Sequence, residues 1–174
     1  MKIILSHRLA QIKPSPTLSL SAAANRLKAN GKPIINLTVG EPDFDTPESI
    51  KQAARAALDQ GFTKYTAVDG MLALKQAVVD KFKRENKLNY PLDHVIVSSG
   101  AKQSIYNLMQ CLLNPDDEVI IPAPYWVSYP DMALLAEAKP VIIATSIKQQ
   151  LKITPAQLEA AITEKTRLFI INSP

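Results

Sequence analysis

The sequence predicts an α/β fold built on a largely parallel sheet. From residue 94 onward, four short β-prone segments alternate with stretches of helical length. Apolar residues recur at helical spacing within these stretches. The 174 residues are 47% apolar and 21% charged, which is typical of a globular chain with one ordinary core. Strands and helices that alternate in this way form βαβ units, whose helices cover both faces of a parallel sheet.

The first 45 residues differ in residue pattern from the rest of the chain. We expect an arm, a helix near residues 19–30 and a short strand that ends at Gly40. The strand prediction rests on the apolar run of residues 34–37. The predicted domain boundary therefore separates residues 1–45 from residues 46–174.

The second part opens with two predicted helices. Thr46 is an N-cap candidate, and Pro47 suits the first helical position because its missing N–H costs nothing there. Gly61 closes this helix. The next helical pattern runs from about Met71 to Lys87.

Regular alternation follows the second helix. The last predicted helix opens with Thr154 and Gln157 in a capping box and with Pro155 at its first position. The predicted strands cover residues 94–98, 118–122, 140–144 and 167–172, and the predicted helices cover residues 101–113, 125–137 and 155–163.

Composition argues against several functional classes. The net charge is +4, but the basic residues are scattered, which disfavours a nucleic-acid-binding surface. No apolar run is long enough to span a bilayer, and no metal-ligand spacing occurs. Cys111 is the single cysteine, so no intramolecular disulfide can form. With no signal-peptide segment near the first residues, we expect a reducing, cytoplasmic compartment.

The end of the strand predicted at 94–98 is the first candidate site, because ligands gather at the carboxyl ends of parallel strands. There Ser99 and Gly100 precede Ala101 and Lys102 at a predicted helix start. Such a turn lets backbone approach a ligand, and the N–H groups of the helix start favour an anion such as phosphate. Taken alone, the turn is more readily interpreted as a plain N-cap with a turn glycine than as a ligand site. Without a Walker or dinucleotide glycine pattern, a nucleotide-binding domain is disfavoured.

The second candidate is the segment of residues 122–129, which holds Trp126, the one tryptophan. At the same sheet edge, this indole is suited to stack on a flat heteroaromatic ring, and the alternative is that it covers the core. The acidic residues Glu41, Asp43 and Asp45 read as turn formers and caps more readily than as acid–base groups. Tyr65 is either a packing residue or a hydroxyl donor.

Five motifs in order give a stronger signal than any of them alone. They are Gly40-Glu-Pro-Asp-Phe-Asp-Thr-Pro47, Gly61-Phe-Thr-Lys-Tyr65, Ser99-Gly-Ala-Lys-Gln103, Pro122-Ala-Pro-Tyr-Trp-Val-Ser-Tyr-Pro130 and Asn172-Ser-Pro174. This series closely resembles the pyridoxal-phosphate-dependent aminotransferases of class I, near the bacterial aspartate aminotransferases. The resemblance implies the three-layer α/β/α large domain of the aspartate-aminotransferase type (PLP fold type I), here incomplete, preceded by an N-terminal arm and a small-domain segment.

The resemblance also implies roles toward the cofactor, pyridoxal 5'-phosphate. The backbone of Gly100 and Ala101, with Lys102 beside it, would form part of the phosphate cup. Trp126 would stack on the pyridine ring. Tyr65 would reach across the interface of a homodimer to the phosphate of the neighbouring subunit's cofactor.

Toward the amino-acid substrate, the resemblance places Gly40 against the carboxylate and Trp126 beside the bound molecule. Two departures from the family pattern occur. Residues 114–117 read Asn-Pro-Asp-Asp where Asp-Pro-Gly-Asp is usual, and Ala138 stands where a glycine is common. Aspartate tolerates turn conformations, so we expect small local shifts and no lost site.

The largest departure concerns the groups that carry out catalysis. In the family, Asn-Ser-Pro is followed by one residue and then Asn-Pro-Thr-Gly, so Asn172 is not the asparagine that bonds the pyridine hydroxyl. The Schiff-base lysine, the aspartate that pairs with the pyridine nitrogen and the substrate-binding arginine are expected beyond residue 174. The 174 residues alone are therefore expected to be inactive.

Family topology also implies missing sheet neighbours. Residues 168–171 would form an uncovered apolar edge, the kind that pairs with other molecules. We expect the isolated chain to be poorly soluble or partly unfolded, and a sharp cooperative melt of a monomer would contradict this.

Two functions from different classes remain open. The first is the N-terminal part of an aminotransferase that exchanges an amino group between an L-amino acid, expected to be aspartate, and a 2-oxo acid. A β-lyase or decarboxylase is possible within the same fold, because these motifs hold the cofactor and say little about which bond breaks. The alternative is a catalytically inactive truncated module that only binds ligand or dimerises.

Overall fold

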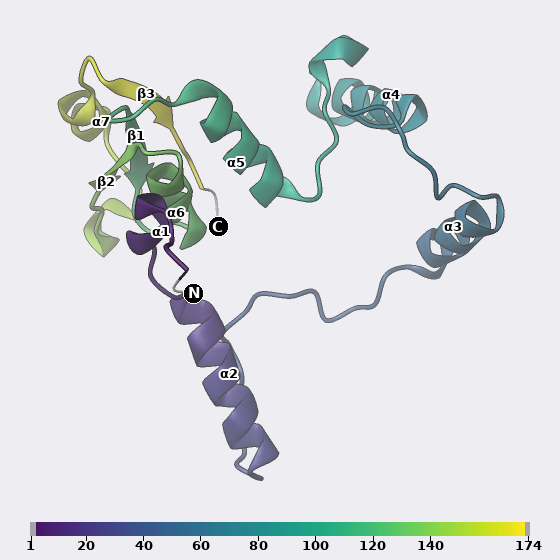
Figure 1. Ribbon diagram of the computed structural model, residues 1–174, viewed down its shortest axis with the longest axis horizontal. Coiled ribbons are helices and arrows are strands. Elements are labelled where there is room, and N and C mark those ends of the chain that lie inside the picture. The colour runs from purple at the N-terminus through teal and green to yellow at the C-terminus, as the bar shows by residue number, and fades with distance from the viewer. Residues whose placement is uncertain (1–2, 173–174) are drawn as a thin grey trace. The chain divides into compact units, whose positions relative to one another are not determined.

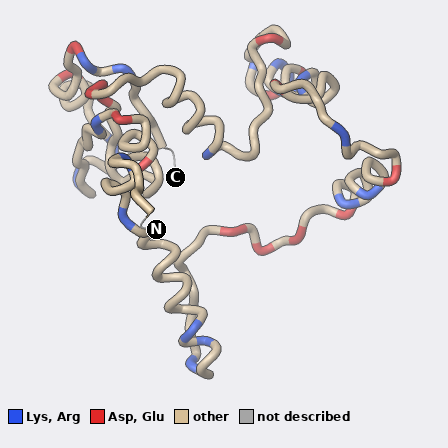
Figure 2. Tube along the Cα trace, viewed as in Figure 1, with Lys and Arg blue, Asp and Glu red and all other residues tan. Residues whose placement is uncertain are grey.

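The computed structural model describes residues 3–172 and divides the chain into two compact units (Figure 1). The first unit comprises the described parts of Met1–Val39 and Ile105–Pro174, and the second comprises Gly40–Ser104. Lys and Arg are distributed along the described chain of both units, as the sequence predicts (Figure 2).

The first unit is built on a sheet of three parallel strands in the order β2-β1-β3. Strand β1 (Glu118–Pro122) lies between β2 (Lys139–Ile143) and β3 (Thr166–Phe169). Val119 pairs with Pro140 of β2 and with Leu168 of β3. Three of the four predicted strands are thus confirmed, although the third is shorter than residues 167–172. Strand β3 is an edge strand of the described sheet, where the apolar edge was expected.

The helices of this unit agree closely with the predicted ranges. They are α5 (Ala101–Leu112), of which residues from Ile105 belong here, α6 (Ser128–Leu135) and α7 (Pro155–Ala161). The crossover from β1 to β2 runs through α6, and the crossover from β2 to β3 passes back over β1 through α7. Because crossovers between parallel strands are right-handed, opposite directions of travel place α6 and α7 on opposite faces of the sheet. Both helices contact β2.

The core of the first unit lies on the α5 and α6 side of the sheet. Val119 and Ile121 point to that face and pack with Met109 of α5 and Met132 of α6. Ile120 points to the opposite face because side chains alternate along a strand. All three central residues of β1 have no exposed surface. A strand buried on both faces requires an unbroken apolar sequence, and Val-Ile-Ile supplies it.

Strand β1 begins with a buried acid. Glu118 is 7% exposed, and its carboxylate accepts hydrogen bonds from Thr163 Oγ1 at 2.7 Å and Lys139 Nζ at 3.4 Å. The Thr163 hydrogen bond, followed by Lys139, lowers the pKa of Glu118 below its usual value, against the opposing effect of burial. The ionised Glu118 side chain therefore connects the first residues of β1 and β2 with the turn before β3.

A local sequence signal sets the start of α7 as predicted. The capping box of α7 is present: Thr154 Oγ1 accepts the Gln157 N–H at 3.2 Å, and Gln157 Oε1 accepts the Thr154 N–H at 3.0 Å. Helix α6 ends differently, because its last turn is closed by Glu137 in the left-handed region at φ 62°. The Ala138 N–H donates to Ala133 O at 2.9 Å.

The two departures from the family pattern meet at that helix end. Asp116 also has a positive φ, 70°, and its N–H donates to the Glu137 carbonyl at 3.1 Å. Ala138 itself is buried, and the left-handed residue is the one before it. Asp116 and Glu137 thus both adopt the left-handed backbone conformation that glycine usually occupies.

The N-terminal part of the first unit consists of two helices. Helix α2 (Pro16–Ala29) confirms the helix predicted near residues 19–30, and α1 (His7–Ala10) precedes it. Helix α1 lies against α6 (Figure 1). The strand predicted to end at Gly40 is wrong: residues 34–37 carry no strand, and the side chain of Ile35 is exposed. No other described strand pairs with this segment, and an apolar run without a ladder partner does not form a strand.

The second unit contains α3 (Glu48–Asp59) and α4 (Leu72–Lys81), and α4 continues through a π-helical turn (Phe82–Asn86). These helices confirm the two predicted ones. Helix α3 begins after Pro47, which takes the N-cap position, so the prediction that Thr46 caps the helix is wrong. Gly61 follows the last turn with φ +80°, as expected of a helix-ending glycine.

The strand predicted over 94–98 is also wrong. A 3₁₀ turn (Leu92–His94) precedes an extended segment that has no strand pairing among the described residues. Its Val97 N–H donates to the Asp69 carbonyl at 3.0 Å. Asp69 also accepts from Lys75, which is buried, and this hydrogen bond lowers the pKa of the Asp69 carboxyl below its usual value. A hydrogen bond to the Asp69 carbonyl therefore holds this apolar segment, for which the sequence pattern predicted a strand.

Candidate functional site

The carboxyl edge of the sheet lies in the first unit, and Trp126 follows β1 there. The indole is 38% exposed. Its ring meets that of Tyr129 edge to face, with the ring centroids 5.5 Å apart and the planes at 82°. The Tyr129 N–H also donates to the Trp126 carbonyl at 3.0 Å. Trp126 therefore packs on the first turn of α6 and keeps part of its surface accessible, while its stacking on a ligand ring stays a prediction.

Tyr129 links this loop to the end of β3. It is nearly buried in the core cluster, and its phenolic O–H donates to Asn172 Oδ1 at 3.1 Å. Asn172 is the last described residue of the fifth motif; Ser173 and Pro174 lie outside the described residues. Sequence reasoning did not single out Tyr129, because a contact between residues this far apart leaves no local signal.

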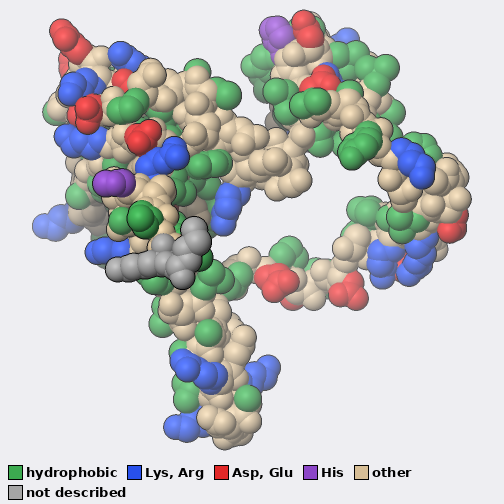
Figure 3. Space-filling view, viewed as in Figure 1, with side chains coloured by type: hydrophobic (Ala, Val, Ile, Leu, Met, Phe, Trp, Pro, Cys, Tyr) green, Lys and Arg blue, Asp and Glu red, His purple; other side chains and the backbone are tan. Residues whose placement is uncertain are grey.

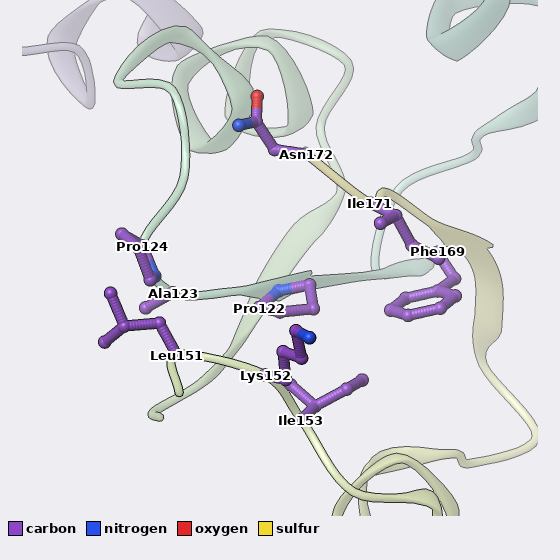
Figure 4. A pocket seen from close by; sticks show the side chains of 9 residues that line it. All are labelled: Pro122, Ala123, Pro124, Leu151, Lys152, Ile153, Phe169, Ile171 and Asn172. Carbon is purple, nitrogen blue, oxygen red and sulfur yellow. The ribbon is translucent and has the colours of Figure 1, made fainter. Parts of the chain in front are cut away.

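A cavity of about 200 Å³ opens at the same sheet edge (Figure 4). It is bordered by the segment after β1, the segment before α7 and the end of β3. Mostly apolar groups line it, with the Lys152 ammonium and the Asn172 amide as polar exceptions (Figure 4). The rule that ligands gather at carboxyl ends of strands indicates this edge, but it gave no signal for the Leu151–Ile153 segment.

The glycine turn belongs to the second unit. Gly100 has φ +87°, and a Cβ placed on it would meet nothing within 4 Å. Its carbonyl accepts the Gln103 N–H at 3.2 Å, so the helix begins at Ala101. The Ser99 N–H donates to Gln103 Oε1 at 2.5 Å. The turn therefore presents an open backbone surface at the first residue of a 12-residue helix, with exposed Ala101 and Lys102 side chains.

This turn follows an extended segment and not a strand. The prediction that it shares a sheet edge with Trp126 rested on a strand over 94–98, so it stays a prediction.

Gly40 and Tyr65 also lie in the second unit, and both are exposed. The acidic residues Glu41, Asp43 and Asp45 follow Gly40 along an irregular segment before α3 (Figure 2). Of the residues predicted to bind cofactor or substrate, the structure places Trp126 in the first unit and the others in the second.

Residues 3–172 lack two kinds of feature, a membrane-spanning helix and a metal-binding cluster. No helix there is long and apolar enough to cross a membrane. Within the same residues, no group of His, Cys, Asp and Glu side chains has the arrangement of a metal site.

Comparison of the fold with solved structures defines a class of protein. The chain is similar to the aspartate aminotransferase of Rhizobium meliloti, with a TM-score of 0.94 and 49% identity over 99% of this chain and 43% of that one. It is similar to the Thermus thermophilus aspartate aminotransferase with maleate, with a TM-score of 0.95 and 43% identity over 99% of this chain and 45% of that one. The fold is therefore the α/β fold of the aspartate aminotransferases.

The family follows from the sequence comparisons. Residues 32–174 match the model of the class I and II aminotransferases. The chain is 61% identical to the aspartate/prephenate aminotransferase of Nitrosomonas europaea over 98% of this chain and 43% of that protein. It is 51% identical to the aspartate aminotransferase of a Bacillus species over all of this chain and 44% of that protein. The chain belongs to the class I and II aminotransferase family and spans less than half of the length of these relatives.

Proposed function

We propose that this chain forms the amino-terminal part of a pyridoxal-phosphate-dependent aminotransferase that transfers an amino group between L-aspartate and a 2-oxo acid. The observation that carries the proposal is the 61% identity to an aspartate/prephenate aminotransferase over 98% of the chain. The geometry of the sheet edge and of the glycine turn agrees with it.

The residues present fit the cofactor. The phosphate needs backbone N–H groups at a helix start and close approach of the chain. Gly100 provides that approach, because it adopts φ +87° with open space where a side chain would lie. The pyridine ring needs an accessible aromatic face, and Trp126 keeps 38% of its surface exposed.

Each of these residues has a separate task in the proposal. The backbone of Gly100 and Ala101 and the ammonium of Lys102 would hold the phosphate, and Trp126 would orient the ring. Gly40 would leave room for the carboxylate of the amino acid. When bound, pyridoxal phosphate supplies the electron sink that weakens bonds at the amino acid's Cα. The lysine that moves the proton is expected beyond residue 174.

The substrate proposal rests on the relatives. The Nitrosomonas europaea and Cereibacter sphaeroides relatives are both named aspartate/prephenate aminotransferases. The Thermus thermophilus structure contains maleate, which is a four-carbon dicarboxylate like aspartate. We therefore take aspartate as the amino donor and prephenate as one acceptor to be tested beside smaller 2-oxo acids.

Assembly and location form part of the same proposal. The complete enzyme would be a homodimer in which the exposed Tyr65 reaches the phosphate bound by the partner subunit. A cytoplasmic enzyme agrees with a single cysteine and no disulfide.

The decisive experiment begins with the mass of the native polypeptide. An immunoblot of source cells against this 19.1 kDa chain comes first. The purified native protein is then assayed for amino transfer from aspartate to 2-oxoglutarate and to prephenate. We expect a product more than twice as large that catalyses the transfer. A native product of 19.1 kDa without transfer activity would overturn the proposal in favour of an inactive module that binds ligand or dimerises.

A further inference from the structure

Tyr129 is a core residue whose ring contacts Trp126, the candidate ring-stacking side chain. Its ring edge lies against Trp126 with the centroids 5.5 Å apart, which is the edge-to-face geometry that aromatic pairs prefer. Tyr129 is 9% exposed and belongs to the core cluster of the first unit. A buried ring is held by its neighbours, so it can restrict the motion of the half-exposed indole that rests on it.

The hydroxyl of Tyr129 adds a second connection. It donates to Asn172 Oδ1 at 3.1 Å. The backbone before Asn172 is fixed by the Ile170 N–H, which donates to the Ile120 carbonyl at 3.0 Å. Tyr129 therefore joins the segment after β1 to the segment after β3, at the edge where the cavity opens.

We propose that Tyr129 is a positioning residue: its ring fixes the orientation of the Trp126 indole, and its hydroxyl couples that orientation to the chain at Asn172. This inference rests on the proposed function only where it concerns the cofactor. The orientation of Trp126 is a property of the chain itself and is tested separately.

The first test uses Trp126 as its own reporter, because it is the one tryptophan in the chain. The variants are Tyr129→Leu, which removes ring and hydroxyl, Tyr129→Phe, which removes the hydroxyl, and Asn172→Ala, which removes the acceptor. Tyr106→Phe is the matched control, since Tyr106 also packs against this core. Fluorescence anisotropy and acrylamide quenching are measured for each variant in the full-length protein, in which any tryptophan outside these 174 residues is replaced by phenylalanine.

We expect anisotropy to fall and quenching to rise most in Tyr129→Leu. Tyr129→Phe and Asn172→Ala should show the same smaller change, because each breaks the same hydrogen bond. Tyr106→Phe should match the unmodified chain. Equal anisotropy and quenching in all folded variants would overturn the proposal. Should Tyr129→Leu not fold, as judged by far-UV circular dichroism, Tyr129→Phe and Asn172→Ala still decide it.

The second test measures the dissociation constant of pyridoxal phosphate in the full-length enzyme. Tyr129→Leu should weaken binding by about two- to tenfold, which is the worth of one edge-to-face aromatic pair. Tyr129→Phe should recover most of the affinity, and the visible circular dichroism of the bound cofactor should change in Tyr129→Leu. A core-packing role alone would lower the melting temperature and leave both readouts unchanged. If the unmodified enzyme binds no cofactor, the proposed function fails, while the fluorescence result on Trp126 stands by itself.

Discussion

Strand β1 and helix α3 have equally clear apolar sequence patterns but differ in how far their apolar side chains are buried. Strand β1 carries the unbroken apolar run that a strand covered on both faces needs, and α3 carries apolar residues at helical spacing. Val119, Ile120 and Ile121 in β1 are wholly buried, whereas α3 has no buried residue, and its Leu58 is 63% exposed. Apolar side chains remain on the visible surface (Figure 3). A periodic pattern therefore specifies an element and its apolar face, but burial depends on a partner element in the described chain.

The largest expected effect is in β1. Ile121→Ala should lower the free energy of unfolding of the first unit by about 2–5 kcal/mol, because it removes buried methyl groups and leaves a cavity. Urea unfolding of the full-length protein, followed by the fluorescence of Trp126 as its single tryptophan, measures this unit. Ile142→Ala is the matched control: Ile142 lies in the neighbouring strand and is exposed, so it should cost much less. Equal losses in the two variants would contradict the contrast between buried and uncovered elements.

The next effect compares how helices in the two units end. The residue that closes the last turn of α3 is Gly61, with φ +80°, whereas the last turn of α6 is closed by Glu137, with φ 62°. A left-handed conformation costs a side-chain-bearing residue about 1–2 kcal/mol, and glycine escapes this cost. Glu137→Gly should therefore stabilise the chain by up to about 1 kcal/mol, after the greater chain entropy of glycine is subtracted.

Gly61→Ala is the reciprocal change and should destabilise α3. Thermal unfolding followed by circular dichroism at 222 nm measures both variants. The same sign for the two substitutions would show that local backbone strain does not decide these helix ends.

A smaller effect depends on pH and tests the buried start of β1. The pKa of Glu118 is lower in the folded chain than in the unfolded chain, so its ionised form stabilises the fold above the unfolded-state pKa. This stabilisation is lost as pH falls through the folded-state pKa. Glu118→Gln should therefore be less stable than the unmodified chain at neutral pH, and the difference should shrink toward zero in acid. Urea midpoints across this range measure it, and a difference that stays constant from neutral pH into acid would contradict the prediction.

The smallest effect is expected in α3. Leu58→Ala should change the free energy of unfolding of the 174-residue chain by no more than about 0.5 kcal/mol, as for most exposed positions. Hydrogen exchange of the α3 amides, compared with those of β1, gives the measurement. A large loss of protection would mean that α3 has found a partner surface in solution, and the comparison with β1 would then fail.

The sequence predicted the part of the fold in which strands and helices are neighbours along the chain. The segment from β1 to β3 has the expected elements, order and parallel pairing, because each βαβ unit carries its own sheet partner. Residues 34–37 and 94–98 have equally apolar sequences and form no strand. A strand needs a ladder partner, and the pattern of one segment cannot say whether that partner lies in the same chain.

The candidate site was predicted unevenly for a similar reason. The positions of Gly100 at a helix start and of Trp126 after a strand were predictable from turn chemistry and strand ends, which are local, and their roles toward a ligand stay predictions. Tyr129 was missed because its contact with Asn172 joins residues that only the folded sheet brings together. The cavity at Lys152 was missed for the same reason.

The contact between α1 and α6 sets an order of events during synthesis. A ribosome releases α1 early, but the surface that receives it exists only after β1 and α6 have emerged and the core has formed around Met132 and Ala133. The strand–helix–strand segment from β1 to β2 is local in sequence and can assemble first. Until then α1 has no folded α6 to contact.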